Sequence, residues 1–466
     1  MLPPMSWSLL RNSLLVSGFT TLLAVSCGFL AALWLASLPT RWRQGLLAAA
    51  IVAFALPPFL VTNCWIHLLG ETGVWRSWLP LNIYSLGGTV WILGLMSWPI
   101  TLVVLLSAWR RIEAAQLESD PALNGTALLR WVLWPMGRVA LGQAAVLTFV
   151  LALNNFAVPA ILQVKIFPAE LWVKFNTNFD YAAALALSWP LVLAPMLLIF
   201  CLRHAEPGWP RRQGPASSRA LRRQLGPIWF WSAGLMTVLL LALEVGLPLY
   251  QLAATGRTWT ELPNVWRASS GVVGNSFWLA AMAASLSVSL GLASWRWAIG
   301  RYLWLPLLVP GVLLGVALIF VFNRPVFGVI YQSVAIVVVA WTVRFVAPAW
   351  NAAAQALRSV DRDLTDAARL EGASGWALLR HVFWPQIAPQ AGAGWYVTYL
   401  LCLWDVETLV LIVPPGGETL AVRVFNLLHY GHNAQVNALC LMLLALAAAP
   451  LAIWSFWRGL RANPAS

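Results

Sequence analysis

The stretch "DAARLEGASGWALLRHVFWP" (residues 366–385) is polar and charged, and it interrupts a chain of 466 residues that is otherwise mostly apolar. Hydrophobic residues make up 60% of the chain and charged residues only 10%, a balance that ordinary soluble domains do not show. Apolar runs such as 14–36 and 272–295 exceed the roughly 20 residues that a helix needs to cross a bilayer. The sequence therefore predicts an all-α polytopic membrane protein with the quoted stretch outside the membrane.

Outward from that stretch, apolar runs bounded by Arg, Pro, Gly and Asn predict about 11 transmembrane helices. A cleaved signal peptide is the less favoured interpretation of the first run, because many further runs follow it. The expected spans lie near residues 13–37, 45–69, 84–109, 138–162, 181–202, 227–252, 271–295, 301–322, 327–350, 389–413 and 433–457.

The segment 203–226 separates two series of spans. It contains six arginines and one glutamate together with Pro, Gly and Ser, so it is too polar to span the membrane. The positive-inside rule places it, and the other arginine-bearing loops, in the cytoplasm. We therefore expect a first half at 1–202, a cytoplasmic basic linker at 203–226 and a second half at 227–466.

The quoted stretch has an echo in the first half. "TALLRWVLWP" (126–135) matches "WALLRHVFWP" (376–385) at seven of ten positions with an offset of 250 residues, and "RNSLL" at 11 resembles "GNSFW" at 274. This similarity predicts an internal duplication. The additional span near 227–252 keeps both polar loops on the cytoplasmic side, so the repeats are expected to be parallel.

Residues 357–388 predict a helical hairpin. One weakly apolar face recurs at helical spacing in the first helix, and Gly372 is placed to end it. Ser374 is expected to cap a second short helix through Trp376, which Pro385 and Pro389 would close before the next span. A small hairpin with an apolar face suits insertion into a groove of a partner protein, and an ordinary structured loop is the alternative.

The spacing Asp366, Ala367, Ala368, then Gly372, Val382, Trp384 and Pro385 resembles the coupling-loop signature of binding-protein-dependent ABC transporter permeases. The resemblance covers most of the chain, as two fused permease halves. It implies that the hairpin, with Trp376 on it, docks into a cytoplasmic ATP-hydrolysing subunit. The segment 411–431 resembles the ferric-iron and thiamine branch of that family, which makes ferric iron the first expectation for the solute and thiamine, a phosphonate or a polyamine the alternatives.

The first copy of the loop, at 110–137, departs from this signature. Ala122 stands at the position of Gly372, Glu118 falls where the Asp-Ala-Ala triplet is expected, and only the "WP" ending with Pro135 is kept. This copy is predicted to be degenerate. The family usually has six spans per half, so the five in the first half imply a lost helix or a start that lies upstream.

The resemblance also implies partners. A phosphate-binding P-loop needs a lysine after its glycines, and the only lysines, Lys165 and Lys174, each follow a valine. We therefore expect ATP hydrolysis on a separate subunit, in two copies, and solute delivery by a periplasmic binding protein to this multi-pass protein of the bacterial inner membrane. No catalytic residue, cofactor or nucleic-acid partner is expected.

Ionisable and amide side chains inside spans are candidates for a translocation path, because charges are costly in a bilayer. Asn154 and Asn155 correspond to Trp404 and Asp405 at the 250-residue offset, and Glu407 follows. The alternative is that these residues lie near the outer interface and are solvated. Arg344 lies deeper and is predicted to pair with Asp405 across the interface between the halves.

Two further interpretations are weaker. The spacing of His429 and His432 suits a metal site, but no third ligand is evident, so none is expected. An ion-coupled secondary transporter would also show a duplication and intramembrane charges, but two cytoplasmic coupling loops argue against it. A membrane enzyme would need a nucleophile or carboxylate constellation that the sequence does not offer.

Overall fold

The computed structural model describes residues 7–54, 56–109, 112, 117, 123–178, 188–201, 218–297, 300, 302–358, 360–429 and 433–462. Within these residues every regular element is a helix or a helical turn, as the composition predicts. The chain forms two compact units. Unit 1 comprises Met1–Glu170 with Trp189–Thr258, and unit 2 comprises Leu171–Ser188 with Trp259–Ser466.

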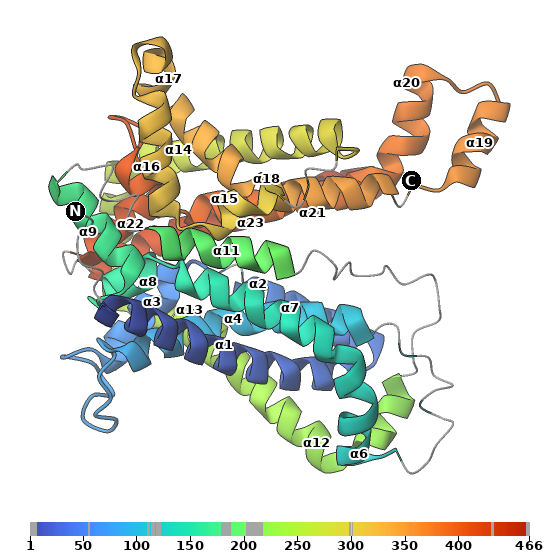
Figure 1. Ribbon diagram of the computed structural model, residues 1–466, viewed down its shortest axis with the longest axis horizontal. Coiled ribbons are helices and arrows are strands. Elements are labelled where there is room, and N and C mark those ends of the chain that lie inside the picture. Colours follow the sequence, from blue (N-terminus) through green and yellow to red (C-terminus); the bar gives the residue numbers. More distant parts are fainter. Residues whose placement is uncertain are drawn as a thin grey trace. The chain divides into compact units, whose positions relative to one another are not determined.

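Three long helices form the centre of unit 1 (Figure 1): α1 (Trp7–Ala36), α4 (Leu86–Trp109) and α7 (Trp134–Leu153) pack against one another. Gly28 allows the close approach of α1 and α4, since a Cβ there would lie 2.5 Å from the carbonyl oxygen of Trp98. The other elements of unit 1 are α2 (Thr40–Phe54), α3 (Pro58–Leu69), α6 (Gly125–Leu128), the π-helical turn η1 (Leu129–Leu133), α8 (Ala157–Ile161), α11 (Trp189–Cys201), α12 (Ser218–Leu241), the π-helical turn η3 (Ala242–Gly246) and α13 (Leu247–Ala254).

Unit 2 is built around α18 (Ala335–Arg358) and α21 (Trp384–Trp404), which pack along each other. The helix α9 (Phe167–Asn178) begins in unit 1 and ends in unit 2, and so does α14 (Gly256–Ser294). The other elements are η4 (Tyr302–Trp304), α15 (Leu305–Leu308), α16 (Gly311–Phe322), η5 (Pro325–Phe327), α17 (Gly328–Tyr331), α19 (Arg362–Leu370), α20 (Gly375–Leu378), the π-helical turn η6 (Leu379–Phe383), η7 (Leu409–Leu411), α22 (Leu420–His429) and α23 (Asn433–Ala462).

Seven helices in the described residues are long and apolar enough to cross a membrane, and nine if each of two bent pairs counts as one span. Each of the 11 predicted spans corresponds to a helix or a bent pair. Two of these helices, α11 and α21, are not among the nine that are long and apolar enough to cross a membrane. The bent pairs are α2 with α3, at 81°, and η4–α15 with α16, at 109°. In both, the second helix begins directly after a proline, Pro57 or Pro310, whose ring cannot continue the preceding helix.

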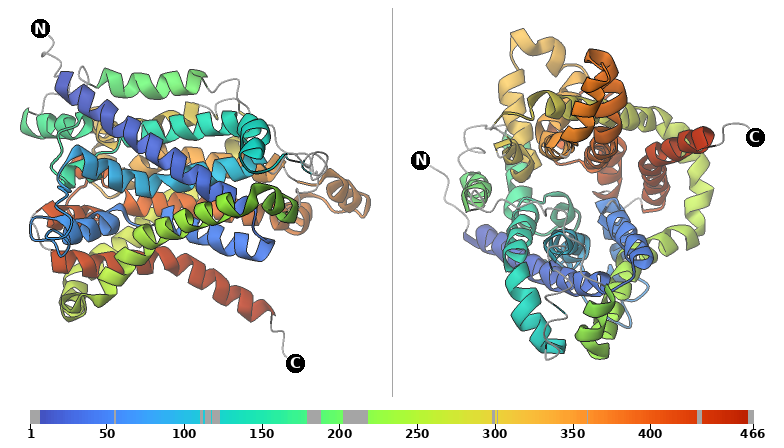
Figure 2. Two further views of the ribbon diagram at one scale, coloured as in Figure 1. Left: turned by 90° about the horizontal axis from the view of Figure 1, so that it is seen from below. Right: turned by 90° about the vertical axis from the view of Figure 1, so that its right-hand side faces the viewer.

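The helix predicted at 227–252 belongs to the first compact unit. It is part of α12, η3 and α13, and α12 packs against α1 and α2 (Figure 2). Gly234 permits this packing, because a Cβ there would lie 2.8 Å from the indole nitrogen of Trp34. The compact units change over after Glu170, Ser188 and Thr258, so this helix lies in unit 1, and the predicted division into halves at 203–226 stays a prediction.

The two units repeat the same local structures, as the sequence similarity predicts. The π-helical turn at 129–133 recurs at 379–383, an offset of 250 residues (379 minus 129), and each leads into a long helix through Trp-Pro. Gly125 and Gly375, one before each short helix, both have φ +50°. The duplication is thus visible in the backbone and not only in residue identities.

Candidate coupling hairpins and buried ionic cluster

The predicted hairpin extends beyond the ends of α18 and α21 (Figure 1), and it consists of α19 and α20 joined by a short turn. Asp366, Ala367 and Ala368 lie on α19, Gly372 lies in the turn and Trp376 lies on α20. Pro385 lies at the base, in the first turn of α21. The structure therefore brings the predicted residues of the second half into one hairpin.

Local hydrogen bonds define both ends of α19. The Asp361 carboxylate accepts a hydrogen bond from the backbone amide of Asp363 at 3.0 Å, which caps the helix N-terminus. At the other end Ala373 N donates to Ala368 O at 2.9 Å and Gly372 N donates to Arg369 O at 3.0 Å. This is a Schellman motif, and Gly372 adopts the φ of +84° that it requires. The prediction that Gly372 ends the first helix is confirmed.

The second helix differs from the prediction in two respects. Ser374 occupies the N-cap position, but its side chain makes no capping hydrogen bond. Pro385 and Pro389 do not close the helix, which passes through η6 into α21 without interruption. The π-helical turn pairs Trp384 N with Leu379 O, five residues back, so the carbonyl that a proline ring would strike in an α-helix is displaced.

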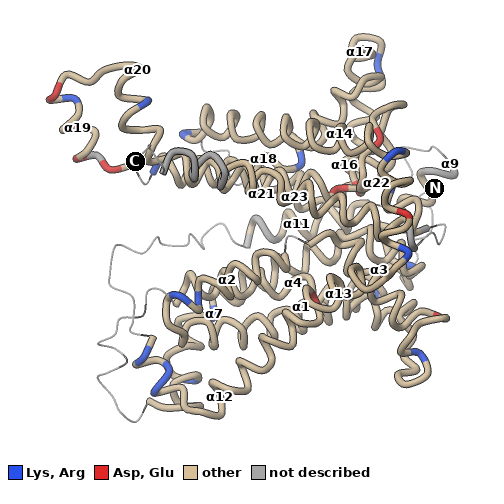
Figure 3. The backbone as a smooth tube through the Cα atoms, turned by 180° about the vertical axis from the view of Figure 1, so that it is seen from behind, with Lys and Arg blue, Asp and Glu red and all other residues tan. Residues whose placement is uncertain are grey.

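The hairpin exposes large apolar side chains. Leu370 is 90% exposed and Trp376 is 72% exposed, and Leu364 and Leu379 are also exposed. Charged residues lie between them, including the exposed ion pair of Arg369 and Asp366 at 3.3 Å (Figure 3). Since a hairpin outside the bilayer has no lipid for these side chains, they form a surface suited to a protein groove.

Part of the first-half loop has the same structure. Asn124 occupies the N-cap position of α6 as Ser374 does before α20, and Pro135 follows η1 as Pro385 follows η6. Leu117 lies fully buried, and its carbonyl accepts a hydrogen bond from Gln224 of α12. Glu118 and Ala122 lie outside the described residues, so the predicted degeneracy of this copy stays a prediction.

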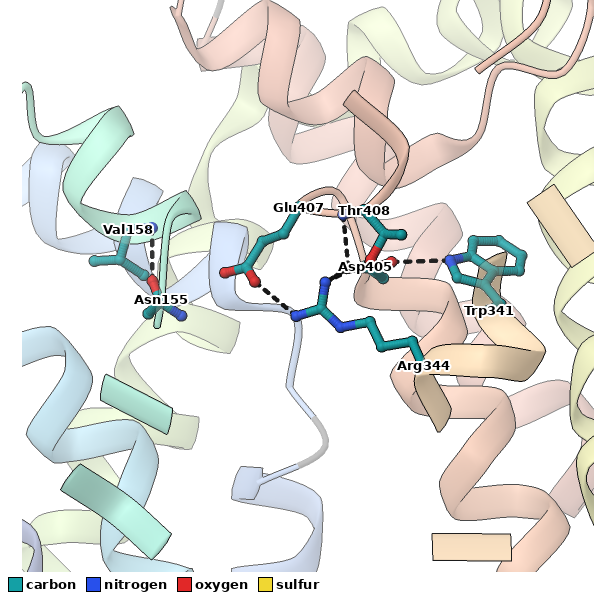
Figure 4. A network of polar contacts seen from close by, with 7 residues as sticks. All are labelled: Asn155, Val158, Trp341, Arg344, Asp405, Glu407 and Thr408. Carbon is teal, nitrogen blue, oxygen red and sulfur yellow. Dashed lines mark hydrogen bonds and ion pairs between the residues drawn. The ribbon is translucent and has the colours of Figure 1, made fainter. Parts of the chain in front are cut away.

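Unit 2 also contains a buried cluster of charges around Arg344 (Figure 4). From the middle of α18, Arg344 donates to the Asp405 carboxylate at 3.1 Å and to the Glu407 carboxylate at 2.7 Å. The same guanidinium donates to the Thr408 hydroxyl, and Trp341 Nε1 donates to Asp405 at 3.1 Å. Arg344, Asp405 and Glu407 are each less than 10% exposed.

This geometry confirms the predicted pair of Arg344 with Asp405 and corrects its setting. The pair forms within unit 2, between α18 and the segment that follows α21, not across an interface between the halves. The alternative that Asp405 and Glu407 are solvated is wrong, because both are buried and ion-paired. Charges buried in this way need close pairing, which the two carboxylates and the guanidinium supply.

Gly311 makes room for the cluster. A Cβ at this first residue of α16 would lie 1.6 Å from Arg344 Nη1 and 2.5 Å from the Glu407 Cβ. Any side chain here would therefore displace the guanidinium. Together with Trp341 and Thr408, Gly311 completes the cluster, and sequence reasoning did not single out these three residues.

The first half has the same turn without the charges. Asn155 Oδ1 accepts from Val158 N at 3.2 Å, as Asp405 Oδ1 accepts from Thr408 N at 3.4 Å. Asn154 beside it is buried. Gly94 stands at the position equivalent to Arg344 (344 minus 250) and packs on Leu23. The role of Asn154 and Asn155 in a translocation path remains a prediction.

Unit 1 has a buried acid of its own. Glu244 in η3 is fully buried, and its carboxylate accepts a hydrogen bond from Trp98 Nε1 at 2.6 Å. The contact joins α4 to the helix formed by α12, η3 and α13. Glu244 is therefore a packing contact inside unit 1.

The Asn-Ser pairs at 12–13 and 275–276 make the same contacts in both units. In the sequence these pairs indicated only the duplication. The Ser13 hydroxyl accepts from Phe167 N at 2.9 Å, and the Ser276 hydroxyl accepts from Leu420 N at 2.8 Å. Asn12 and Asn275 donate to backbone carbonyls just before those amides. The first pair thus holds the first residue of α9 against α1, and the second pair holds the first residue of α22 against α14.

The second half of the chain matches a known family. Residues 268–458 match the family model described as the binding-protein-dependent transport system inner membrane component. This region includes the hairpin of α19 and α20 and the whole ionic cluster. The first half lies outside the match, and it resembles the matched region through the internal repeat.

Two relatives illustrate the similarity. The spermidine/putrescine transport system permease protein PotC of Escherichia coli K12 is 31% identical over 91 residues, which cover 20% of this chain and 34% of the relative. A putative 2-aminoethylphosphonate transport system permease protein, PhnV of Salmonella paratyphi A, is 28% identical over 158 residues, which cover 34% of this chain and 58% of the relative. The chain thus spans between about a third and three fifths of these relatives.

Proposed function

We propose that the whole chain is the membrane-spanning subunit of an ATP-driven importer, since residues 268–458 match the model of the binding-protein-dependent transport system inner membrane component. The subunit hydrolyses nothing itself. It receives a small solute from a periplasmic binding protein and opens to either side as partner ATPases close and reopen. Two ATPase copies, one for each hairpin, fit the internal duplication.

The observation that carries this proposal is the exposed apolar surface of the hairpin. Leu370 and Trp376 contribute almost nothing to packing within the chain, being 90% and 72% exposed. Aromatic and leucine side chains of this kind anchor protein interfaces when a groove covers them. The two long helices that carry the hairpin, α18 and α21, then connect the ATPase to the membrane interior.

The test measures assembly and ATP hydrolysis after co-expression with the ATPase subunit and the binding protein. Trp376→Ala and Leu370→Ala should each weaken ATPase docking by about thirtyfold, the effect of losing an interface hot spot of about 2 kcal/mol. Stimulation of ATP hydrolysis by loaded binding protein should fall with it. Gly372→Glu is a less clean variant, since the φ of +84° strains any side chain at this position.

Trp78→Ala is the matched control. Trp78 is 86% exposed, and it lies in the loop before α4. It is at the opposite end of that helix from residues 110–137, the first copy of the predicted coupling loop, which we call the first coupling segment. Its replacement should leave ATPase docking unchanged. Equal docking by Trp376→Ala, Leu370→Ala and Trp78→Ala would overturn the hairpin assignment and favour a secondary transporter. Uptake that continues without ATP and stops when ion gradients are dissipated would have the same meaning.

We further propose that the solute carries a protonated amine. The names of the two relatives give spermidine, putrescine and 2-aminoethylphosphonate as their solutes, and all three contain amines. Ferric iron, indicated by the segment 411–431, is the competing prediction. No group of three His, Cys, Asp or Glu side chains placed to hold a metal is found among the described residues.

ATP-dependent uptake into proteoliposomes containing the complete complex separates the two solutes. Labelled putrescine and 2-aminoethylphosphonate should be compared with ferric iron, each offered with the binding protein encoded beside this chain. Uptake of an amine supports the proposal. Uptake of iron alone would overturn the amine and leave the importer assignment standing.

A further inference from the structure

A cavity of about 160 Å³ lies in unit 1, at the end of the unit where the first coupling segment leaves the bundle. Its inner wall is buried and apolar, with Trp109, Ile112, Leu117 and Leu221 each less than 10% exposed. Its rim is open, because Ile51 and Val103 are 50% and 43% exposed. The cavity therefore offers an apolar slot that is reached from the outer surface of unit 1.

Arg43 is the one charged residue among the described residues that line this cavity. It lies in the first turn of α2, where the positive-inside rule puts the cytoplasmic membrane surface. Among the described residues no carboxylate lies within 4.0 Å of its guanidinium. A slot that is apolar within and cationic at its cytoplasmic mouth matches the two parts of an anionic phospholipid.

The start of α12 extends the positive charge around this slot. Gly226, with φ +76°, and Pro227 separate the segment 218–225 from the rest of α12. In that segment Leu221 and Leu225 are buried against unit 1, whereas the arginines Arg219, Arg222 and Arg223 are exposed. Figure 3 shows the arginine-bearing ends of α2 and α12 at the same end of unit 1. A basic amphipathic segment of this kind lies well at an anionic membrane surface.

We propose that this slot binds one anionic phospholipid, with an acyl chain against Leu47, Leu106 and Leu221 and the phosphate held by Arg43. The acyl chain contacts Ile112 and Leu117, which belong to the first coupling segment. The bound lipid therefore holds these two side chains against unit 1. No step of the proposal depends on the solute that the chain transports.

The test is lipid retention by the purified full-length chain, measured by native mass spectrometry during titration with phosphatidylglycerol, phosphatidylcholine or inorganic phosphate. Phosphatidylglycerol should be retained with one molecule bound more tightly than the rest. Arg43→Gln should weaken that molecule by about fivefold, the effect of one arginine near a membrane surface. Arg41→Gln is the matched control, since Arg41 is exposed on the same helix and does not line the cavity.

A second variant tests the apolar part of the slot. Ser107→Phe fills the cavity and leaves Arg43 in place, so it should also reduce retention of phosphatidylglycerol. Equal weakening by Arg43→Gln and Arg41→Gln would overturn the site and leave only diffuse attraction to a basic surface. Binding of inorganic phosphate with the same dependence on Arg43 would overturn the lipid. An effect of Arg43→Gln on stability without any change in lipid retention would overturn it as well.

Discussion

At the scale of the residue, Arg344 is the cation of the buried ionic cluster in unit 2. Its guanidinium donates hydrogen bonds to two buried carboxylates and a hydroxyl, so its removal would leave Asp405 and Glu407 buried without a cation. Buried charges are costly unless they are paired, and the cost of breaking such a group exceeds the net stability that the intact group provides. The cluster also joins the middle of α18 to the outer end of α21, the two helices that carry the hairpin.

Arg344→Leu is therefore expected to destabilise the protein by about 3 to 5 kcal/mol. Thermal unfolding of the purified protein in detergent measures this loss. Adding Asp405→Asn and Glu407→Gln to the same protein should restore much of it, because no uncompensated charge then remains. Arg324→Leu is the control, since Arg324 is exposed and contacts only the face of Phe320. A small effect of Arg344→Leu would mean that the carboxylates are solvated, as in an open aqueous path.

At the scale of the element, the three π-helical turns among the described residues share one feature. Each ends two residues before a proline, at Pro135, Pro248 and Pro385. A proline donates no hydrogen bond and collides with the carbonyl four residues back, and a turn that pairs residues five apart removes the collision. A long helix can then continue through a residue that normally ends it.

The hydrogen bond between the Ser276 hydroxyl and the first amide of α22 also acts between elements, because a side chain of α14 caps the N-terminus of α22. Ser276→Ala should remove an N-cap interaction of about 1 kcal/mol, which corresponds to about fivefold more frequent opening of the first turn of α22. Hydrogen exchange of the amides from Leu420 onward measures this change. Ser13→Ala should have the same effect on the first turn of α9.

Ser294→Ala is the matched control for Ser276→Ala. Ser294 lies on the same helix, and its hydroxyl bonds only to the carbonyl of Leu290 within that helix. Exchange in α22 should not respond to this change. If Ser294→Ala and Ser276→Ala raise exchange equally, the effect comes from α14 as a whole and not from the cap.

Sequence reasoning located most elements but not their internal geometry. Hydropathy placed a helix or a bent pair at each predicted span, of which nine are long and apolar enough to cross a membrane among the described residues. Gly372 was assigned correctly because its turn needs a positive φ that glycine provides without strain. Hydropathy averages over a window, so it could not show that the spans at 45–69 and 301–322 bend at Pro57 and Pro310. The rule that proline ends a helix failed at Pro385, because it assumes α-helical pairing and a π-helical turn precedes this proline. It also failed at Pro389, which lies inside α21.

The same difference holds for the residues of the buried ionic cluster and the helix caps: some could be predicted from the sequence and others could not. Intramembrane charge identified Arg344 and Asp405 as partners, since each needs the other in an apolar setting. Gly311 and Ser276 gave no such signal, because a glycine or a serine is unremarkable in a membrane helix. Their roles depend on a neighbour distant in the sequence, which only the folded chain brings close.

At the scale of the whole molecule, the chain contains two copies of one plan that have diverged in chemistry. The π-helical turns, the Asn-Ser contacts and the prolines at the bends recur in both units. The ionic cluster occurs in unit 2, where Arg344 and Asp405 replace Gly94 and Asn155. The proposed lipid slot lies in unit 1, beside the coupling segment that keeps less of the family signature. The shared plan is therefore a property of the backbone, and the differences lie in the side chains.

Gly125 and Gly375 allow the two copies of the predicted coupling loop to be compared with equal perturbations. Both have φ +50°, and a Cβ at either position meets nothing closer than 3.9 Å, so an alanine strains only the backbone. Gly125→Ala and Gly375→Ala should each cost about 1 kcal/mol in local stability. We expect stimulation of ATP hydrolysis by loaded binding protein to fall more for Gly375→Ala, because the second hairpin carries the complete signature. Equal losses would show that the first copy couples as well as the second, and a larger loss for Gly125→Ala would reverse the predicted order of the two hairpins.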